Sequence, residues 1–208
     1  MKYKRYFRKT SLKQPGVGDF FLDIVSIKKP KTFLEVGVFQ GVTARNICDL
    51  LFKIHKNKFS YIGLDLFEIN QENISEVIPN TVFSNPFKKI YFKFFQKNDP
   101  YSLEAVEDLL KNYKENVHLI KGNSNIILKK IDMSKIDFVF LDGGHEYETV
   151  LNDLTCCKEV IENSGTILCD DYNLSFAPGV KKAIDEFVIK NNYRCEILFN
   201  YRFAKIIK

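Results

Sequence analysis

The chain has 208 residues, of which 45% are hydrophobic and 27% charged, so it can bury the core of one α/β domain and is too apolar to be largely disordered. The net charge is +5, and no apolar run follows the basic residues at the start, which argues against a secretory signal. No stretch reaches the length of a membrane span. The cysteine pattern described next leads us to expect a cytoplasmic protein.

Basic residues and cysteines are informative mainly by their positions. A basic arm can bind nucleic acid, lipid headgroups or phosphorylated substrates, but we favour a solvated and partly frayed terminus. The arm contains Lys2, Lys4, Arg5, Arg8, Lys9 and Lys13.

Five cysteines without a CxxC pair indicate reduced thiols and do not support a zinc site. Cys156 and Cys157 are adjacent on a predicted helix.

Helices and strands are predicted to alternate along the chain, starting with a helix over 19–29 that ends at Pro30. We predict strands at 31–37, 60–65, 116–121, 136–141 and 166–169. We predict the other helices at 42–54, 102–115, 146–162 and 179–190. The C-terminal run 193–208 has two β-rich halves split by Asn200, which predicts an antiparallel pair. The pattern indicates a single domain over 1–208, with a Rossmann-like α/β sheet of seven mostly parallel strands and helices on both faces.

Residues 66–101 interrupt this alternation. Their apolar content is too high for a solvated linker, as shown by Phe83, Phe87, Ile90, Tyr91, Phe92, Phe94 and Phe95. A basic stripe would form on a helix from Lys89, Lys93 and Lys97. We predict a substrate lid or a dimer contact, because an insertion after the second strand emerges at the active-site edge of the sheet. A helix on a membrane surface and a packing element without a binding role are the alternatives.

The first chemical motif is EVGVFQG, residues 35–41, at the end of the first strand. Gly37 and Gly41 allow a sharp turn and the close approach of a ligand, and the following helix points its free N–H groups at that ligand. Phe39 fills the middle glycine position of the dinucleotide-binding pattern, which weakens that interpretation. The carboxylate of Glu35 suits a cationic amino-acid moiety instead. An ordinary βα turn is the alternative.

The next two strands also end in polar residues. Asp65 follows Gly41 by 24 positions, and a carboxylate at this place can accept hydrogen bonds from both hydroxyls of a ribose. A helix cap is the simpler role for Asp65. After the third strand, the loop of Gly122, Asn123 and Ser124 can reach the edge of an adenine, and Ser124 can also be the N-cap of the next helix.

The strongest pattern combines LDGGH with CDDY at the ends of the fourth and fifth strands. Neighbouring parallel strands end side by side, so Asp142, Asp170 and Asp171 are expected to meet in one crevice. Three uncompensated carboxylates repel one another, and a divalent cation with oxygen ligands, such as Mg²⁺, Mn²⁺ or Ca²⁺, removes the conflict. His145 adds an imidazole as a candidate base. Separate solvated carboxylates are the alternative.

These motifs resemble those of class I methyltransferases that use S-adenosylmethionine (SAM). EVGVFQG is similar to the E-x-G-x-x-x-G first motif of catechol-type O-methyltransferases, and LDGGH with CDDY resembles their metal-binding strand ends. DGGHEYETVLNDL also resembles the family that includes macrocin-type sugar O-methyltransferases. The resemblance covers residues 32–190, apart from 66–101. It implies a seven-stranded methyltransferase sheet and methyl transfer to a hydroxyl of a small molecule or sugar, with Mg²⁺ as the expected metal.

The resemblance also implies roles for individual residues. The implied cofactor-binding residues are Glu35 and Gly37 near the methionine end, Asp65 on the ribose, Ser124 near adenine, and Gly41, Gly122 and Asp142. Asp142, Asp170 and Asp171 would hold the metal, and His145 falls where catechol-type enzymes carry a lysine base. The family often has Asn at the position of Asp171 and Asp at the position of Asn123, so this metal site is more negative and the adenine contact of Asn123 is in doubt.

Two other function classes stay open beside this one. A methyltransferase acting on RNA or protein is one, although enzymes that methylate DNA amino groups have a proline-rich aromatic motif where this chain has Asp-Gly-Gly-His. A non-catalytic SAM-binding module is the other, and the intact carboxylates at every expected strand end argue against it. We expect a small-molecule hydroxyl acceptor rather than nucleic acid, and a homodimer is an open alternative to a monomer.

Overall fold

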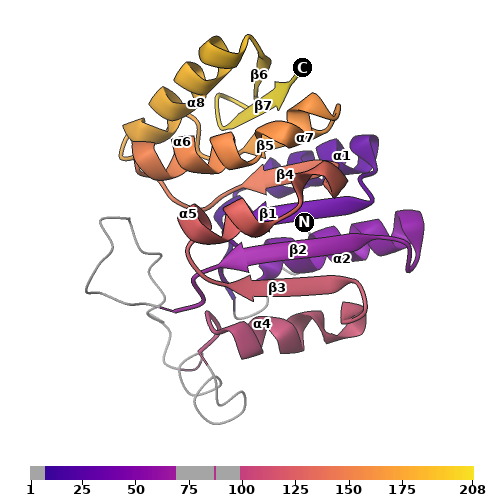
Figure 1. Ribbon diagram of the computed structural model, residues 1–208. Helices are drawn as coiled ribbons and strands as arrows, with labels where there is room; N and C mark the ends of the chain where they lie inside the picture. Colours follow the sequence, from indigo (N-terminus) through magenta and orange to yellow (C-terminus); the bar gives the residue numbers. More distant parts are fainter. Residues whose placement is uncertain (1–7, 69–86, 88–98) are drawn as a thin grey trace.

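One seven-stranded sheet organises the residues that the computed structural model describes, which are 8–68, 87 and 99–208 (Figure 1). The strand order is β3-β2-β1-β4-β5-β7-β6. The strands are β1 Thr32–Val36, β2 Ser60–Asp65, β3 Val117–Lys121, β4 Phe138–Leu141, β5 Thr166–Cys169, β6 Arg194–Leu198 and β7 Phe203–Ile207. The first five strands are parallel, and β7 pairs antiparallel with β5 and β6. The predicted Rossmann-like sheet with its C-terminal antiparallel pair is confirmed.

Helices cover both faces of this sheet (Figure 1). On one face lie α1 Val17–Lys28, α2 Val42–His55 and α4 Leu103–Leu110. On the other lie α5 Ser124–Ile127, α6 Tyr147–Cys156, α7 Lys158–Glu162 and α8 Pro178–Asn191. Short 3-10 helices are present at Ser11–Lys13, Lys111–Tyr113, Leu128–Lys130 and Met133–Lys135.

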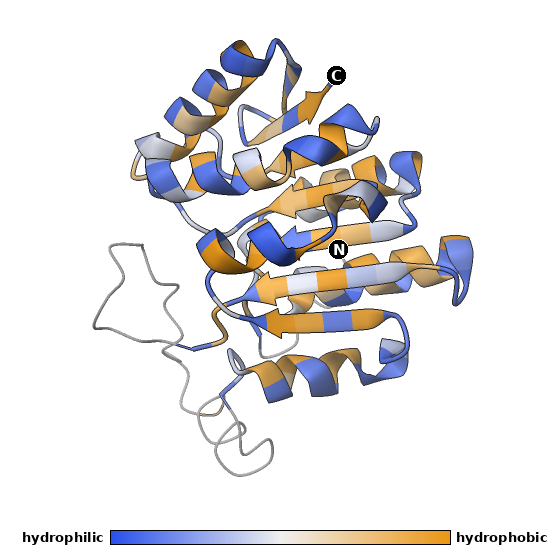
Figure 2. Cartoon of the chain, viewed as in Figure 1, coloured by the Kyte–Doolittle hydropathy of each residue, from blue (hydrophilic) through white to orange (hydrophobic). Residues whose placement is uncertain are grey.

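The two helix layers enclose two apolar cores, one on each side of the sheet. Successive side chains of β1 alternate between them, with Phe33 in the core under α1 and α2 and Leu34 in the core under α6 and α8. Figure 2 shows apolar residues along the strands, while the helices carry apolar and polar residues together. By the same alternation Glu35 follows Phe33 into the α1–α2 side, where a carboxyl group is unusual.

One predicted helix, over 146–162, is wrong as a continuous element. It breaks at Cys157, whose φ of −87° and ψ of 2° are not helical, so Cys156 and Cys157 do not share a helix. The break lets α7 place Val160 and Ile161 fully inside the core. All five cysteines are free, as expected for reduced thiols.

The expectation of a solvated basic terminus is wrong for Arg8. Its side chain is buried, and its guanidinium donates to the carbonyl oxygens of Gln40 at 3.0 Å, Pro100 at 3.0 Å and Ala105 at 2.8 Å. The five fixed N–H donors of arginine suit such a cluster of carbonyls, which compensates for burial of the charge. Arg8 therefore ties the start of the described chain to the turn after β1. Lys2, Lys4 and Arg5 lie outside the described residues.

Most of the segment 66–101 also lies outside the described residues. This applies to the predicted lid or dimer contact and to all of its supporting side chains except Phe87. Within the part of the chain that is described, no helix is both long enough and apolar enough to cross a membrane.

Candidate active site

The carboxyl ends of the parallel strands meet along one edge of the sheet. Backbone hydrogen bonds join neighbouring ends, because Gly122 donates its N–H to the carbonyl of Asp65 at 2.9 Å and Asp142 donates to Val36 at 2.8 Å. The residues predicted to bind the cofactor all lie at or beside this edge. They are Glu35, Gly37, Gly41, Asp65, Gly122, Ser124 and Asp142.

The turn after β1 passes very close to the end of β4. Gly37 has a φ of 94°, and a Cβ atom there would lie 2.0 Å from the carbonyl oxygen of Asp142. No side chain fits this space, so the glycine is required by the contact between two strand ends as well as by the turn. Phe39, in the middle glycine position, also has a positive φ of 51°.

Asp65 is held by neutral donors at the end of β2. Its Oδ2 accepts the backbone N–H of Phe39 at 2.7 Å, and its Oδ1 accepts the hydroxyl of Tyr101 at 2.7 Å and the N–H of Phe67 at 3.2 Å. Burial and the charge of Asp65 raise the pKa of Tyr101, so this hydroxyl stays protonated as a donor. The sequence prediction did not include Tyr101, because its local pattern carries no mark of a site. A ribose hydroxyl would have to share Asp65 with it.

Glu35 is a fully buried carboxyl group at the end of β1. The hydroxyl of Tyr61 donates to its Oε2, whereas its Oε1 has no hydrogen-bond partner among the described residues. Burial raises the pKa of Glu35 to about 8; the bond from Tyr61 lowers it and the charge of Asp65 raises it further. Such a group can accept an ammonium ion, which stabilises the ionised form.

The loop after β3 differs from the prediction in one respect. Asn123, not Ser124, is the N-cap of α5, and its side chain accepts the N–H of Asn125 at 2.9 Å. Asparagine is a strong N-cap residue, so the cap lies one residue earlier than the expected cap at Ser124. Ser124 is the first residue of α5, and its contact with adenine stays a prediction.

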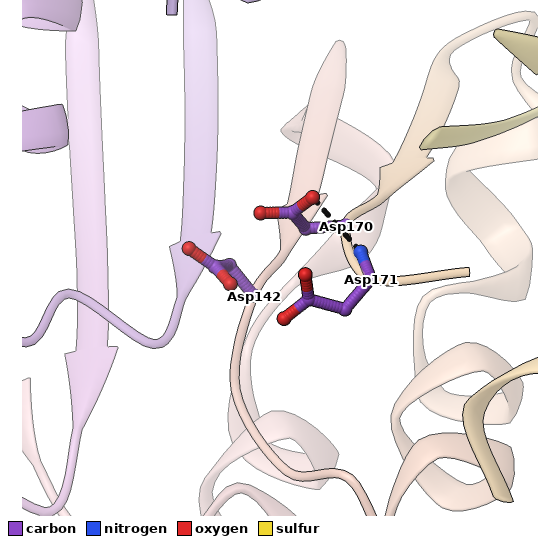
Figure 3. Close-up of side chains that lie close together, drawn as sticks. All are labelled: Asp142, Asp170 and Asp171. Carbon is purple, nitrogen blue, oxygen red and sulfur yellow. Dashed lines mark hydrogen bonds between the residues drawn. The ribbon is translucent and has the colours of Figure 1, made fainter. Parts of the chain in front are cut away.

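Asp142, Asp170 and Asp171 meet at the ends of β4 and β5, as predicted (Figure 3). One oxygen of each lies within 4.8 Å of the others. Desolvation and the charges of Asp170 and Asp171 raise the pKa of Asp142 well above its ordinary range, and the hydroxyl of Ser11 donates to its Oδ2 at 2.7 Å. Burial and the charge of Asp171 raise the pKa of Asp170 to about 6. The cluster therefore carries more negative charge than its surroundings stabilise.

Arg202 supplies part of the missing positive charge, and the sequence prediction did not include it. Its Nε donates to Oδ1 of Asp170 at 2.7 Å and its Nη2 to Oδ2 at 2.6 Å, a bidentate ion pair, while Nη2 lies 3.5 Å from Oδ1 of Asp171. An arginine of the protein thus balances part of the charge that the sequence argument assigned to a metal ion. No local pattern in the sequence marks Arg202, because the antiparallel register of β7 against β5, with Cys169 opposite Ala204, is what places it beside Asp171.

The turn before Arg202 has an unusual backbone. Phe199, Asn200 and Tyr201 have consecutive φ values of 48°, 53° and 65°, in the left-handed region that costs a non-glycine residue about 1–2 kcal/mol. Arg202 donates its N–H to the carbonyl of Phe199 at 3.1 Å and accepts from the N–H of Tyr172 at 2.9 Å. These bonds fix Arg202 in place, and strained backbone of this kind is concentrated at functional sites.

His145 lies beside this cluster, on the loop between β4 and α6. Its Nε2 is 3.2 Å from Oδ2 of Asp171, and its side chain is 21% exposed. A pocket opens here, lined in part by Asp142, His145, Asp153 and the two aspartates after β5. The arrangement places a candidate base and its carboxylate partner on a pocket wall, as general acid–base chemistry requires.

Comparisons with known proteins agree with this geometry. A family model described as a methyltransferase domain matches residues 34–172. An uncharacterised protein of Acanthamoeba polyphaga mimivirus is 35% identical over 165 residues, a match that covers 77% of this chain. The matched region makes up 61% of that relative, so this chain spans less than two thirds of the relative's length.

Several solved structures share the fold at low sequence identity. The O-methyltransferase NovP is 19% identical with a TM-score of 0.65, and the match covers 96% of this chain and 83% of NovP. The methyltransferase PaMTH1 of Podospora anserina, bound to S-adenosylhomocysteine (SAH), gives 16% identity, a TM-score of 0.60 and coverages of 98% and 82%. The TDP-rhamnose 3'-O-methyltransferase CalS11 is 13% identical with a TM-score of 0.61, and the match covers 94% of this chain and 81% of CalS11. These likenesses establish the arrangement of the sheet and helices.

Proposed function

This chain belongs to the methyltransferase-domain family, and we propose that it transfers a methyl group from SAM to a hydroxyl group of a small molecule or sugar, assisted by a divalent cation. The observation that carries this proposal is the meeting of Asp142, Asp170, Asp171 and His145 beside the turn after β1. NovP and CalS11, which share the fold, are O-methyltransferases, and PaMTH1 binds SAH, the product that SAM leaves.

The cofactor would lie across the ends of β1, β2 and β3. The buried oxygen of Glu35 that lacks a partner among the described residues suits the ammonium group of the methionine moiety, and the turn Gly37 to Gly41 allows close approach. Asp65 would accept ribose hydroxyls, while Gly122 and Ser124 would lie near adenine. Support for this orientation comes from the neutral donors around Asp65, which leave its negative charge to a ligand.

The three aspartates fit a hard divalent cation. They offer only carboxylate oxygens, which Mg²⁺ and Mn²⁺ prefer, and one oxygen of each lies within 4.8 Å of the others. Such an ion would be held by Asp142, Asp170 and Asp171, and when bound it would lower the pKa of an acceptor hydroxyl and orient it.

His145 is the proposed base of the reaction. Its imidazole would take the proton of the acceptor hydroxyl, and Asp171, 3.2 Å from Nε2, would stabilise the imidazolium that forms. The acceptor oxygen then forms a bond to the methyl carbon, and the electron pair of the carbon–sulfur bond stays on sulfur, which yields neutral SAH. Charge is neutralised as the anionic oxygen meets the sulfonium, which a preorganised site favours.

The test begins with acceptor discovery. A metabolite extract is incubated with wild-type protein and SAM labelled in its methyl group, and labelled products are identified by mass spectrometry. We expect a labelled hydroxyl compound, and we expect His145→Asn to lower its rate of formation by about 10²–10⁴-fold with little change in SAM affinity. A product labelled on nitrogen, or an unchanged rate with His145→Asn, would contradict the proposed chemistry.

A further inference from the structure

We propose that Arg202 sets the charge of the three-aspartate site so that it matches one divalent cation. This inference rests on the proposed function. Among the residues that the structure describes, Arg202 is the one lysine or arginine within ion-pair distance of Asp142, Asp170 or Asp171.

Formal charges give the first reason. Three ionised aspartates carry three negative charges, and the guanidinium of Arg202 reduces the sum to two. One divalent cation then makes the site neutral, whereas without Arg202 one negative charge would be left over. The side chain of Asp170 is 0% exposed and that of Arg202 is 14% exposed, so water screens an imbalance poorly at this place.

Hydrogen-bond capacity gives the second reason. A carboxylate oxygen has two acceptor sites, and Oδ1 of Asp170 already accepts both Nε of Arg202 and the N–H of Asp171 at 2.8 Å. Among the described residues, its Oδ2 accepts only Nη2 of Arg202, so one acceptor site is left for another partner. The arginine therefore occupies one oxygen of Asp170 fully and leaves the other able to bind a cation.

In the other two aspartates, too, one carboxylate oxygen has a hydrogen-bond partner and the other is left with more free acceptor capacity. Oδ2 of Asp142 accepts the hydroxyl of Ser11, and Oδ2 of Asp171 faces His145. Within the described part of the chain, Oδ1 of Asp171 has only the 3.5 Å contact with Arg202, which is too long for a strong hydrogen bond. Each aspartate thus keeps capacity on one oxygen, and none of the three needs to lose a protein contact to bind an ion.

Rigidity is the third reason. The left-handed turn of Phe199, Asn200 and Tyr201 and the backbone bonds on both sides of Arg202 hold the guanidinium against Asp170. The arginine is therefore a fixed part of the site rather than a mobile surface cation.

The test measures Mn²⁺ binding to the whole protein by isothermal titration and electron paramagnetic resonance, independently of turnover. The variants are Arg202→Gln, Asp171→Asn, the double variant with both changes, and Arg202→Lys as the control that keeps the charge. Asp171→Asn keeps an oxygen ligand but lowers the negative charge, and we expect it to weaken Mn²⁺ binding roughly tenfold. Arg202→Gln should strengthen binding by a similar factor. The double variant and Arg202→Lys should bind Mn²⁺ within about threefold of wild type.

Several results would overturn the inference. If Arg202→Gln weakens Mn²⁺ binding equally in the wild-type protein and in the Asp171→Asn variant, the role of the arginine is purely structural. A wild type that binds no Mn²⁺ yet binds SAM and transfers methyl groups would show that Arg202 replaces the ion, while the proposed methyl transfer would stand. A wild type that does not bind SAM would contradict the proposed function instead. If Arg202→Gln does not fold, as circular dichroism would reveal, unchanged Mn²⁺ affinity in Asp171→Asn would by itself overturn the inference.

Discussion

Two regions of the sheet edge hold their carboxylates by different means. The proposed cofactor half, Glu35 and Asp65 at the ends of β1 and β2, is held by neutral donors from Tyr61, Phe39 and Tyr101. The aspartate half, after β4 and β5, is held in part by charge, from Arg202. Neutral donors keep a carboxylate in place without cancelling its charge, so the cofactor half suits a ligand with hydroxyl and ammonium groups. The aspartate half is arranged around charge balance, which suits a metal ion.

The largest effect is expected where the two halves touch. Gly37→Ala would place a Cβ atom 2.0 Å from the backbone oxygen of Asp142, and a backbone cannot yield as a flexible side chain does. We expect a loss of about 4 kcal/mol or more in the free energy of unfolding, measured by urea denaturation. The matched control is Gly143→Ala, whose Cβ would meet its nearest atom, in the side chain of Val36, at 3.3 Å. Equal stability of the two variants would contradict the tight contact.

Removing a charge from one half should weaken the binding of that half's ligand and leave the binding of the other ligand unchanged. Asp65→Ala removes hydrogen bonds from ribose hydroxyls to a charged acceptor, worth about 1.5–3 kcal/mol each, and SAM affinity should fall at least tenfold while Mn²⁺ affinity is kept. Asp171→Asn should show the reverse. Isothermal titration of both variants with both ligands checks this, and a SAM affinity unaffected by Asp65→Ala would remove the ribose assignment.

Glu35 predicts a pH dependence of stability in the cofactor half. Its pKa in the folded protein, about 8, is above its ordinary value of 4.5, so the folded state favours the neutral form. The stability from this group is fully present below pH 4.5 and is lost as the pH rises to about 8, with a slope of up to about 1.4 kcal/mol per pH unit. Glu35→Gln cannot ionise and should lose less stability than wild type between pH 5 and 8 in urea titrations.

The exposed Glu104→Gln serves as the control for that experiment. It should leave the pH dependence of wild type unchanged, because its carboxyl group is not buried. If wild type and Glu35→Gln lose stability in parallel over this range, Glu35 is already ionised in the folded protein.

The smallest effect is expected at Tyr101, which shares Asp65 with the proposed ribose. Tyr101→Phe removes the hydroxyl that donates to Oδ1 of Asp65 at 2.7 Å and keeps the ring that packs on Phe39. If the tyrosine competes with the ribose, SAM affinity should rise about threefold, a gain of less than the net value of one hydrogen bond. A weaker affinity would show that the tyrosine orients Asp65 for the ligand.

The same two regions show what could be predicted from the sequence. The strands Ser60–Asp65 and Thr166–Cys169 were predicted at both ends, because apolar runs that stop at a carboxylate are local signals. The three aspartates followed from the rule that parallel strands end side by side. Tyr101 and Arg202 did not, because they reach Asp65 and Asp170 across 36 and 32 positions through tertiary contacts. Side chains brought in by long-range pairing have no local pattern to identify them.

We propose that the cofactor half binds SAM by itself, whereas the aspartate half needs a divalent cation for turnover. The most direct measurement is methyl transfer from labelled SAM, with EDTA and again with Mg²⁺ restored, beside isothermal titration with SAM under both conditions. We expect EDTA to abolish turnover, Mg²⁺ to restore it, and SAM affinity to change by less than about threefold, since Asp65 and Glu35 do not depend on the ion. Full turnover in EDTA would contradict the division of the site into two halves. A loss of SAM binding when EDTA removes the metal would contradict it as well.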